Sequence, residues 1–149
     1  MRAPAWMLLL LLPALAGCGR RAPRASPDGA VRELVERMRR VQGDLGEAKV
    51  AYLLLSKRAQ QNLAERAKRY SAASGKAIAP EAMIAPSRFL LRFEPQRYTA
   101  HVGGATARVD VVGLRAGDRA SVVCVFEDGG WRVDLPLPPV QMRPGAGKE

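Results

Sequence analysis

The sequence predicts an α+β fold, with helices in its first half and an antiparallel sheet in its second half. Apolar residues recur at helical spacing between positions 31 and 70. Runs rich in β-branched residues follow from position 97, separated by glycine-containing turns. The central part of the chain has the usual size of one domain. We therefore expect a single domain whose N-terminal helices pack in a curved sheet.

The first two helices are predicted from apolar spacing and from capping residues. Residues 28–41 carry apolar side chains on one helical face, and Asp28 is expected to cap this helix. Gly43 ends it and Asp44 caps a second helix over Leu45–Leu55. The second segment is apolar around much of its circumference, which is typical of a buried helix. The apolar face of the first helix is formed by Val31, Leu34, Val35, Met38 and Val41.

A third helix and two short segments complete the first half. Ser56 is expected to cap the third helix and Gly75 to end it. Pro80–Ala85 predicts one short helical turn, because proline suits the first helical position. Ser87–Glu94 alternates apolar and polar residues, and it predicts either a further strand or an extended link. The inner face of the third helix is expected to be Ala59, Leu63, Ala67 and Tyr70.

Four strands are predicted in the second half: Arg97–Val102, Ala105–Leu114, Arg119–Glu127 and Trp131–Leu137. Asp128-Gly129-Gly130 is a tight hairpin signal between the last two. Short turns between consecutive strands predict an antiparallel meander.

The N-terminus has the pattern of a bacterial export signal. Arg2 precedes an apolar run that is shorter than the roughly 20 residues of a membrane-spanning helix. Leu15-Ala16-Gly17-Cys18 then matches a lipobox, which predicts cleavage between Gly17 and Cys18 and acylation of Cys18 by chains such as palmitate. Residues 1–17 are therefore predicted to be a cleaved signal peptide, and two or more acyl chains would anchor the product stably.

The sequence contains two cysteines, Cys18 and Cys124. If Cys18 is acylated, Cys124 has no intramolecular partner, and its apolar neighbours favour a buried free thiol. The alternative is a Cys18–Cys124 disulfide, which requires that Cys18 carries no lipid.

The remaining chain divides into three parts. Residues 18–27 predict a lipidated cysteine followed by a flexible basic tether, residues 28–140 the α+β domain, and residues 141–149 a disordered tail. The chain has a net charge of +10, and removal of residues 1–17 leaves 23 basic against 14 acidic residues. An exported chain does not normally meet nucleic acid, so we expect the basic tether to face anionic lipid headgroups.

Two sequence patterns resemble the nuclear transport factor 2-like superfamily, and in particular its small bacterial lipoproteins of unknown function. They are Gly43-Asp44 followed by Ala51-Tyr52-Leu53-Leu54-Leu55-Ser56, and Glu127-Asp128-Gly129-Gly130-Trp131-Arg132-Val133. The resemblance implies a cone-like fold, a strongly bent antiparallel sheet around helices with a pocket at its open end. It also implies that a sheet face can form a homodimer.

Tyr52, Tyr70 and Trp131 are the candidates for lining such a pocket, although aromatic residues at this spacing more often belong to a core. A pocket of this kind would take a small apolar ligand. Enzymes of the superfamily, which include isomerases and dehydratases, use acids or bases inside the cone. Here only His101 or a carboxylate such as Glu94 could serve.

Other chemistry finds little support in the sequence. Asp110 and Asp134 alternate with apolar residues, so we expect them on the solvent face. One histidine and one spare cysteine do not predict a metal site, and no phosphate-binding motif predicts a cofactor. No catalytic residue is therefore assigned.

The sequence favours a non-catalytic envelope lipoprotein whose domain binds a small apolar ligand or a protein partner, or forms a homodimer. Two alternatives stay open. One is an isomerase or dehydratase type of enzyme, and the other is a structural lipoprotein that holds anionic lipid through basic residues such as Arg20, Arg21 and Arg24. Gly19 after Cys18 favours the outer membrane, with the domain facing the periplasm.

Overall fold

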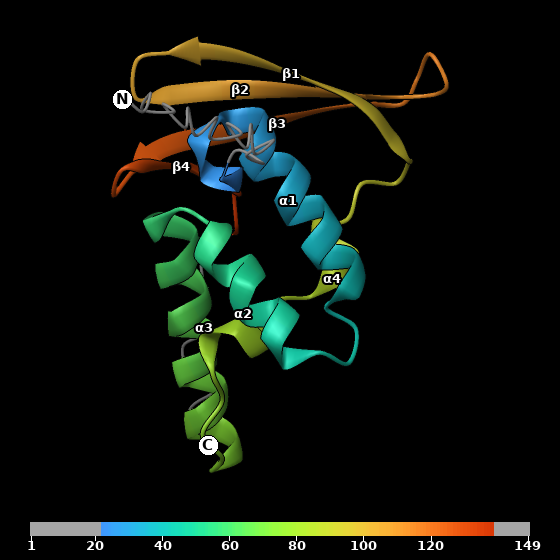
Figure 1. The fold of residues 1–149 in the computed structure, drawn as a ribbon. Helices are drawn as coiled ribbons and strands as arrows, with labels where there is room; N and C mark the ends of the chain where they lie inside the picture. The colour runs from blue at the N-terminus through green and yellow to red at the C-terminus, as the bar shows by residue number, and fades with distance from the viewer. Residues whose placement is uncertain (1–21, 139–149) are drawn as a thin grey trace, which may run out of the picture.

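The computed structural model describes residues 22–138. They form an open four-stranded antiparallel sheet with helices on one side (Figure 1). This confirms the α+β class. The predicted signal peptide, the lipobox with Cys18 and the C-terminal tail lie outside the described residues. The elements are η1 (Pro23–Ala25), α1 (Pro27–Arg40), α2 (Leu45–Leu54), α3 (Lys57–Ser74), η2 (Pro80–Met83), α4 (Pro86–Phe89), β1 (Pro95–Gly103), β2 (Thr106–Gly113), β3 (Arg119–Glu127) and β4 (Gly130–Val133).

Helix α1 begins one position before the residue predicted to cap it. Ser26, and not Asp28, is the N-cap, and its Oγ accepts a hydrogen bond from the Gly29 N–H at 3.2 Å. Pro27 occupies the first helical position, where its missing N–H costs nothing. Asp28 lies inside the first turn, where its negative charge faces the positive end of the helix dipole.

The boundaries of α2 and α3 follow the predicted signals. The Asp44 carboxylate accepts from the Gly46 N–H at 2.8 Å and starts α2. The Ser56 hydroxyl accepts from the Ala59 N–H at 3.1 Å and starts α3. Helix α3 ends at Gly75, whose φ of 69° lies in the left-handed region that glycine adopts easily. These three predictions are confirmed.

Helix α2, predicted to be buried because it is apolar around much of its circumference, is buried on one side only. Ala48, Ala51 and Leu54 are its buried residues, whereas Leu45 is 71% and Leu53 52% exposed. The helix packs against α1, η2 and β4, and none of these elements covers Leu45 or the exposed part of Leu53.

The Ser87–Glu94 segment does not form a strand. Pro86 starts the short helix α4, and irregular chain leads from it to β1. Of the two alternatives for this segment, the strand is therefore wrong. The short turn predicted around Pro80 is confirmed as η2.

The sheet is a meander in the order β1-β2-β3-β4, as predicted. The β3–β4 hairpin turns at Asp128 and Gly129, both with positive φ. Strand β4 ends at Val133 and not at Leu137, because the chain then runs past Pro136, which has no N–H for a ladder. Leu55 forms a parallel bridge to Val133, so the junction between α2 and α3 covers the outer edge of β4.

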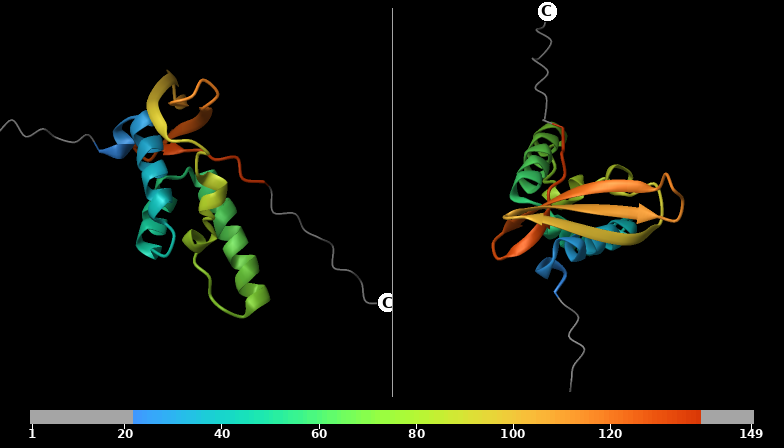
Figure 2. Two further views of the ribbon diagram at one scale, coloured as in Figure 1. Left: turned by 90° about the vertical axis from the view of Figure 1, so that its right-hand side faces the viewer. Right: turned by 90° about the horizontal axis from the view of Figure 1, so that it is seen from above.

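The main core lies between α1 and the sheet. Val31, Leu34 and Met38 of α1 pack toward the strands, where Val109 and Val111 of β2 are completely buried. Helix α3 begins at the β4 edge and runs away from the sheet, as Figures 1 and 2 show. Only α1 therefore lies broadly across the sheet.

Arg132 is a buried charge that joins β4 to the end of α2. Its Nη1 donates to the carbonyls of Leu53 at 2.8 Å and Leu55 at 3.4 Å, and its Nη2 lies 3.3 Å from the Asp128 carboxylate. The last carbonyls of a helix lack helical partners and attract a cation. Arg132 thus caps α2 from the neighbouring strand.

Candidate functional site

The three aromatic residues predicted to line a pocket lie in separate places. Trp131 is buried and meets Phe126 edge to face, with ring centroids 5.4 Å apart. Tyr52 is half-buried, and its hydroxyl donates to the Gln60 carbonyl at 3.3 Å. Tyr70 is 61% exposed, so its predicted place on the inner face of α3 is wrong. It lines an open hollow with Met83 and Ile84, next to η2, and neither Tyr52 nor Trp131 lines that hollow. The three residues line no common cavity.

His101 and Glu94, the residues considered for catalysis, are also apart. His101 lies on an exposed face of β1, with its Nε2 3.1 Å from a carboxylate oxygen of Asp110. Glu94 is exposed and pairs with Arg39 at 2.7 Å. Within residues 22–138, neither points into an enclosed space with a second ionisable group.

The two aspartates predicted on the solvent face have different surroundings. Asp110 lies on that face, as predicted. The side chain of Asp134 is only 16% exposed, because Ser56 donates to it at 2.6 Å and Arg58 at 2.7 Å. Arg58 and Ser56 flank the start of α3, so Asp134 fastens this helix to the strand and does not face open solvent.

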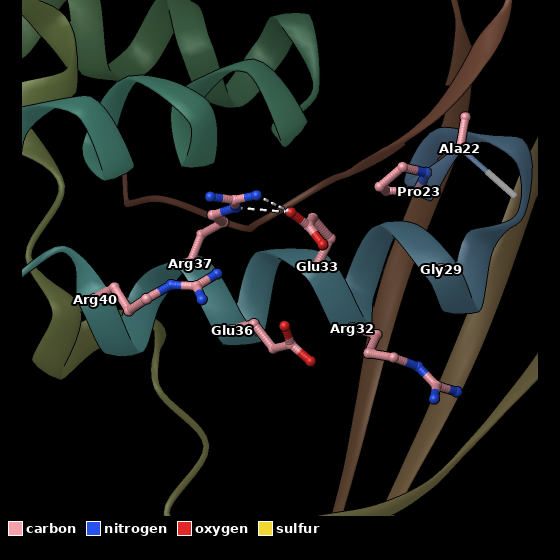
Figure 3. Close-up of a pocket in the computed structure, with 8 residues that line it drawn as sticks. All are labelled: Ala22, Pro23, Gly29, Arg32, Glu33, Glu36, Arg37 and Arg40. Atoms are coloured by element: carbon pink, nitrogen blue, oxygen red, sulfur yellow. Dashed lines mark hydrogen bonds and ion pairs between the residues drawn. The ribbon is translucent and has the colours of Figure 1, made fainter. Parts of the chain in front are cut away.

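A groove of about 750 Å³ runs along α1 (Figure 3). Its lining carries three arginines and two glutamates, and Arg37 is engaged in ion pairs. Arg37 donates to Glu33 at 2.7 Å and to Glu47 at 2.9 Å. The hydrogen bond to Glu47 raises the pKa of Arg37 most, and the one to Glu33 raises it further. The pair with Glu47 joins α1 to α2, whereas the pair with Glu33 lies within α1. The groove is lined by Ala22, Pro23, Gly29, Arg32, Glu33, Glu36, Arg37 and Arg40.

The opposite side of the sheet gives a different surface. No helix of residues 22–138 lies over β1, β2 and β3 on this side (Figure 2, right). Its hollow, about 490 Å³, is shallow and open. We call the polar residues of this side the arginine face. They are Arg97, Thr99, His101, Arg108, Asp110, Arg119 and Ser121.

The strand register brings these residues together. Thr99 and Ser121 lie opposite Asp110 from the two neighbouring strands, and Arg108 lies opposite His101. Arg108 and His101 both approach the Asp110 carboxylate, at 3.6 and 3.1 Å. The face carries three arginines and one carboxylate, so positive charge is in excess, and Thr99 and Ser121 flank the carboxylate of Asp110.

The arginines of this face were not singled out from the sequence. The signal that could have found them is period-two alternation: Arg97, Thr99 and His101 in one strand, and Arg108 and Asp110 in the next. Which residues of neighbouring strands lie opposite one another became evident only from the register.

Cys124 is a buried free thiol, as expected for an unlinked cysteine in an apolar run. Its Sγ lies 3.8 Å from the Pro27 carbonyl, and burial raises its pKa to about 12. A thiol with this pKa is protonated and unreactive at neutral pH.

No group of three or more His, Cys, Asp or Glu side chains in the described part of the chain is placed to hold a metal ion. No helix between residues 22 and 138 combines the length and apolar character needed to cross a bilayer.

No protein-family model matches the chain, and neither the curated proteins nor the solved structures contain a significant match.

Proposed function

We propose that this chain is a lipid-anchored protein of the bacterial envelope, held by acylated Cys18, whose domain binds a protein partner without catalysing a reaction. The arginine face is the proposed binding surface. The observation that carries the proposal is that three arginines and two hydroxyl residues gather on a sheet face that no described helix covers.

The chemistry of this face favours an acidic partner. Arg97 and Arg119 make no ion pair among the described residues, so their guanidinium groups are available to carboxylates. Thr99 and Ser121 supply further hydrogen bonds. The hollow on the arginine face is wide and shallow. It suits a segment of a protein better than a small apolar ligand, which needs an enclosed pocket.

The lipobox supports the anchored location, and Gly19 after Cys18 favours the outer membrane. Mass spectrometry of the N-terminal peptide tests the anchor. We expect cleavage before Cys18 and a mass increase from acyl chains, and we expect Cys18→Ser to move the protein out of the membrane fraction. An unmodified Cys18 in the membrane-extracted protein would contradict the anchor.

Photocrosslinking in cells tests the binding face. A photoreactive amino acid at Thr99 or Ser121 is expected to give one discrete protein adduct. The adduct should disappear when Arg97, Arg108 and Arg119 are all changed to Gln. The matched control changes the exposed residues Arg92, Arg115 and Lys76 to Gln, and it should keep the adduct. Equal adducts in both triple variants would refute an electrostatic role for this face.

We also propose that the domain belongs to the nuclear transport factor 2-like superfamily. The α+β class, the meander and the position of Gly130-Trp131-Arg132-Val133 at β4 support this. In the structure only α1 lies broadly across the sheet, which departs from the cone that the resemblance implies (Figures 1 and 2). An experimental structure in which α2 and α3 also lie within a bent sheet would agree with membership, whereas one that keeps α1 alone across the sheet would contradict it.

A further inference from the structure

The helix-facing side of the sheet extends beyond the start of α1, and apolar side chains are exposed there. Val102 of β1 is 59% exposed and Phe126 of β3 is 48% exposed. The strand register places both on the same side of the sheet as buried Cys124. The Phe126 N–H donates to the Ala105 carbonyl at 2.8 Å, so β3 adjoins the β1–β2 turn at this end.

The N-terminal tether arrives at this end of the molecule. Arg24 of η1 donates from Nη2 to the Glu127 carbonyl at 3.2 Å. The Arg24 side chain also lies close to Gly130. A Cβ atom added at Gly130 would be only 3.0 Å from the Nε of Arg24. Element η1 is therefore packed on the β3–β4 hairpin, next to Phe126, and Figures 1 and 2 show it beside that hairpin.

The length of the tether restricts where the domain can lie. From Cys18 to Ala22 the fully extended chain spans at most about 14 Å. Part of that length crosses the headgroup layer, which is about 5 to 8 Å deep on each side of a bilayer. A domain held by lipid on Cys18 must therefore keep η1 and its neighbours against the membrane surface.

We propose that Val102 and Phe126, together with η1, form a membrane-contacting patch that rests on the headgroups of an anionic bilayer. This inference rests on the proposed acylation of Cys18. Arg24 of η1 lies at this end of the sheet, and the sequence between Cys18 and η1 contains two further arginines, Arg20 and Arg21. Basic residues with an adjacent apolar surface suit the interface of an anionic membrane.

The patch has an internal reporter. The chain contains two tryptophans, Trp6 and Trp131, and cleavage after Gly17 removes Trp6. Trp131 contacts Phe126 with ring centroids 5.4 Å apart. Brominated lipids quench tryptophan only at close range, so quenching of Trp131 reports whether this end lies on the bilayer.

The experiment uses the full mature lipidated protein in vesicles of phosphatidylethanolamine and brominated phosphatidylglycerol, with non-brominated vesicles as the reference. We expect strong quenching of Trp131. The double variant Val102→Ser with Phe126→Ser should lose part of it, because the anchor still holds this end near the bilayer after the apolar contact is removed. The control Leu45→Ser with Leu114→Ser changes residues that are 71% and 86% exposed elsewhere, and it should keep the wild-type quenching. Circular dichroism melting of all variants shows that they fold.

The possible outcomes separate this proposal from the one on which it rests. A lipidated chain without quenching, or with equal quenching in both double variants, overturns the membrane contact and leaves the anchor intact. Unmodified Cys18 overturns the anchor. It also overturns the membrane contact, because the tether restricts the position of the domain only when Cys18 carries a lipid. A dimer in detergent that dissociates in the Val102→Ser, Phe126→Ser variant assigns the patch to a second copy and also overturns the membrane contact.

Discussion

Changing Arg132 to Met tests how the helical part of the molecule is held to the sheet. Methionine keeps an apolar stem of similar length and removes the guanidinium. The carbonyl of Leu53 then loses its 2.8 Å partner, whereas the carbonyl of Leu55 keeps a 3.0 Å hydrogen bond from Gln60. The end of α2 is left with one unpaired carbonyl and no neighbouring cation.

The structure allows an estimate of the loss. A hydrogen bond to a charged group contributes about 1.5 to 3 kcal/mol. The 3.4 Å contact to Leu55 and the 3.3 Å contact to half-exposed Asp128 add little. The Nε of Arg132 is buried without a hydrogen-bond partner, which is unfavourable in the folded protein. Removing the guanidinium relieves this cost and offsets part of the loss. We expect a net decrease of about 2 kcal/mol in the free energy of unfolding, or roughly 8 °C in Tm.

Urea unfolding of the unlipidated mature chain, made as the Cys18→Ser variant, measures this change from the midpoint at constant m. The control is Arg92→Met, at an exposed arginine with no ion pair among the described residues, which should change stability by less than about 0.5 kcal/mol. If Arg132→Met unfolds within about 0.5 kcal/mol of the parent, the reasoning that this arginine joins α2 to β4 is wrong.

Three other predictions concern single positions. Folded Cys124 keeps its proton up to a pKa of about 12, whereas the unfolded thiol loses it near 9, so stability should fall between these pH values. The fall is about 1.4 kcal/mol per pH unit, and the Cys124→Ala variant, titrated by urea unfolding, should lack this component; identical slopes would contradict a buried thiol. Ser56→Ala removes the cap of α3 and a 2.6 Å bond to Asp134, and it should cost about 1 to 2 kcal/mol in thermal unfolding, while exposed Ser87→Ala costs little. Gly75→Ala puts a side chain at φ 69° and should cost about 1 kcal/mol, against almost no cost for Gly103→Ala, which has open space and no positive φ; equal effects in a thermal melt would argue against the left-handed cap.

Local signals in the sequence predicted most helix boundaries. Asp44, Ser56 and Gly75 act through hydrogen bonds or backbone angles within a few residues, so their roles can be read without knowing the fold. Ser26 was missed because Asp28 is an equally good cap by residue type, and only the placement of Pro27 at the first helical position decides between them.

Burial and the candidate site could not be predicted in the same way. An apolar helix such as α2 is buried only where another element lies against it, and Leu45 and Leu53 have none. Tyr52, Tyr70 and Trp131 share a residue class, but no contact brings them together. The arginine face depends on cross-strand register, which places Arg108 opposite His101.

The sequence by itself determined the α+β class, the strand order and the caps, because these follow from period, turn chemistry and hydrogen bonds between near neighbours. It also gave the lipobox at Cys18, whose acylation remains a proposal. Only the tertiary structure decided which side of the sheet the helices cover. That choice left three arginines on the uncovered side, buried Arg132 against the end of α2, and exposed Val102 and Phe126 beside the N-terminal tether. The physical reason is that exposure and proximity depend on packing between segments far apart in the chain, which no local pattern specifies.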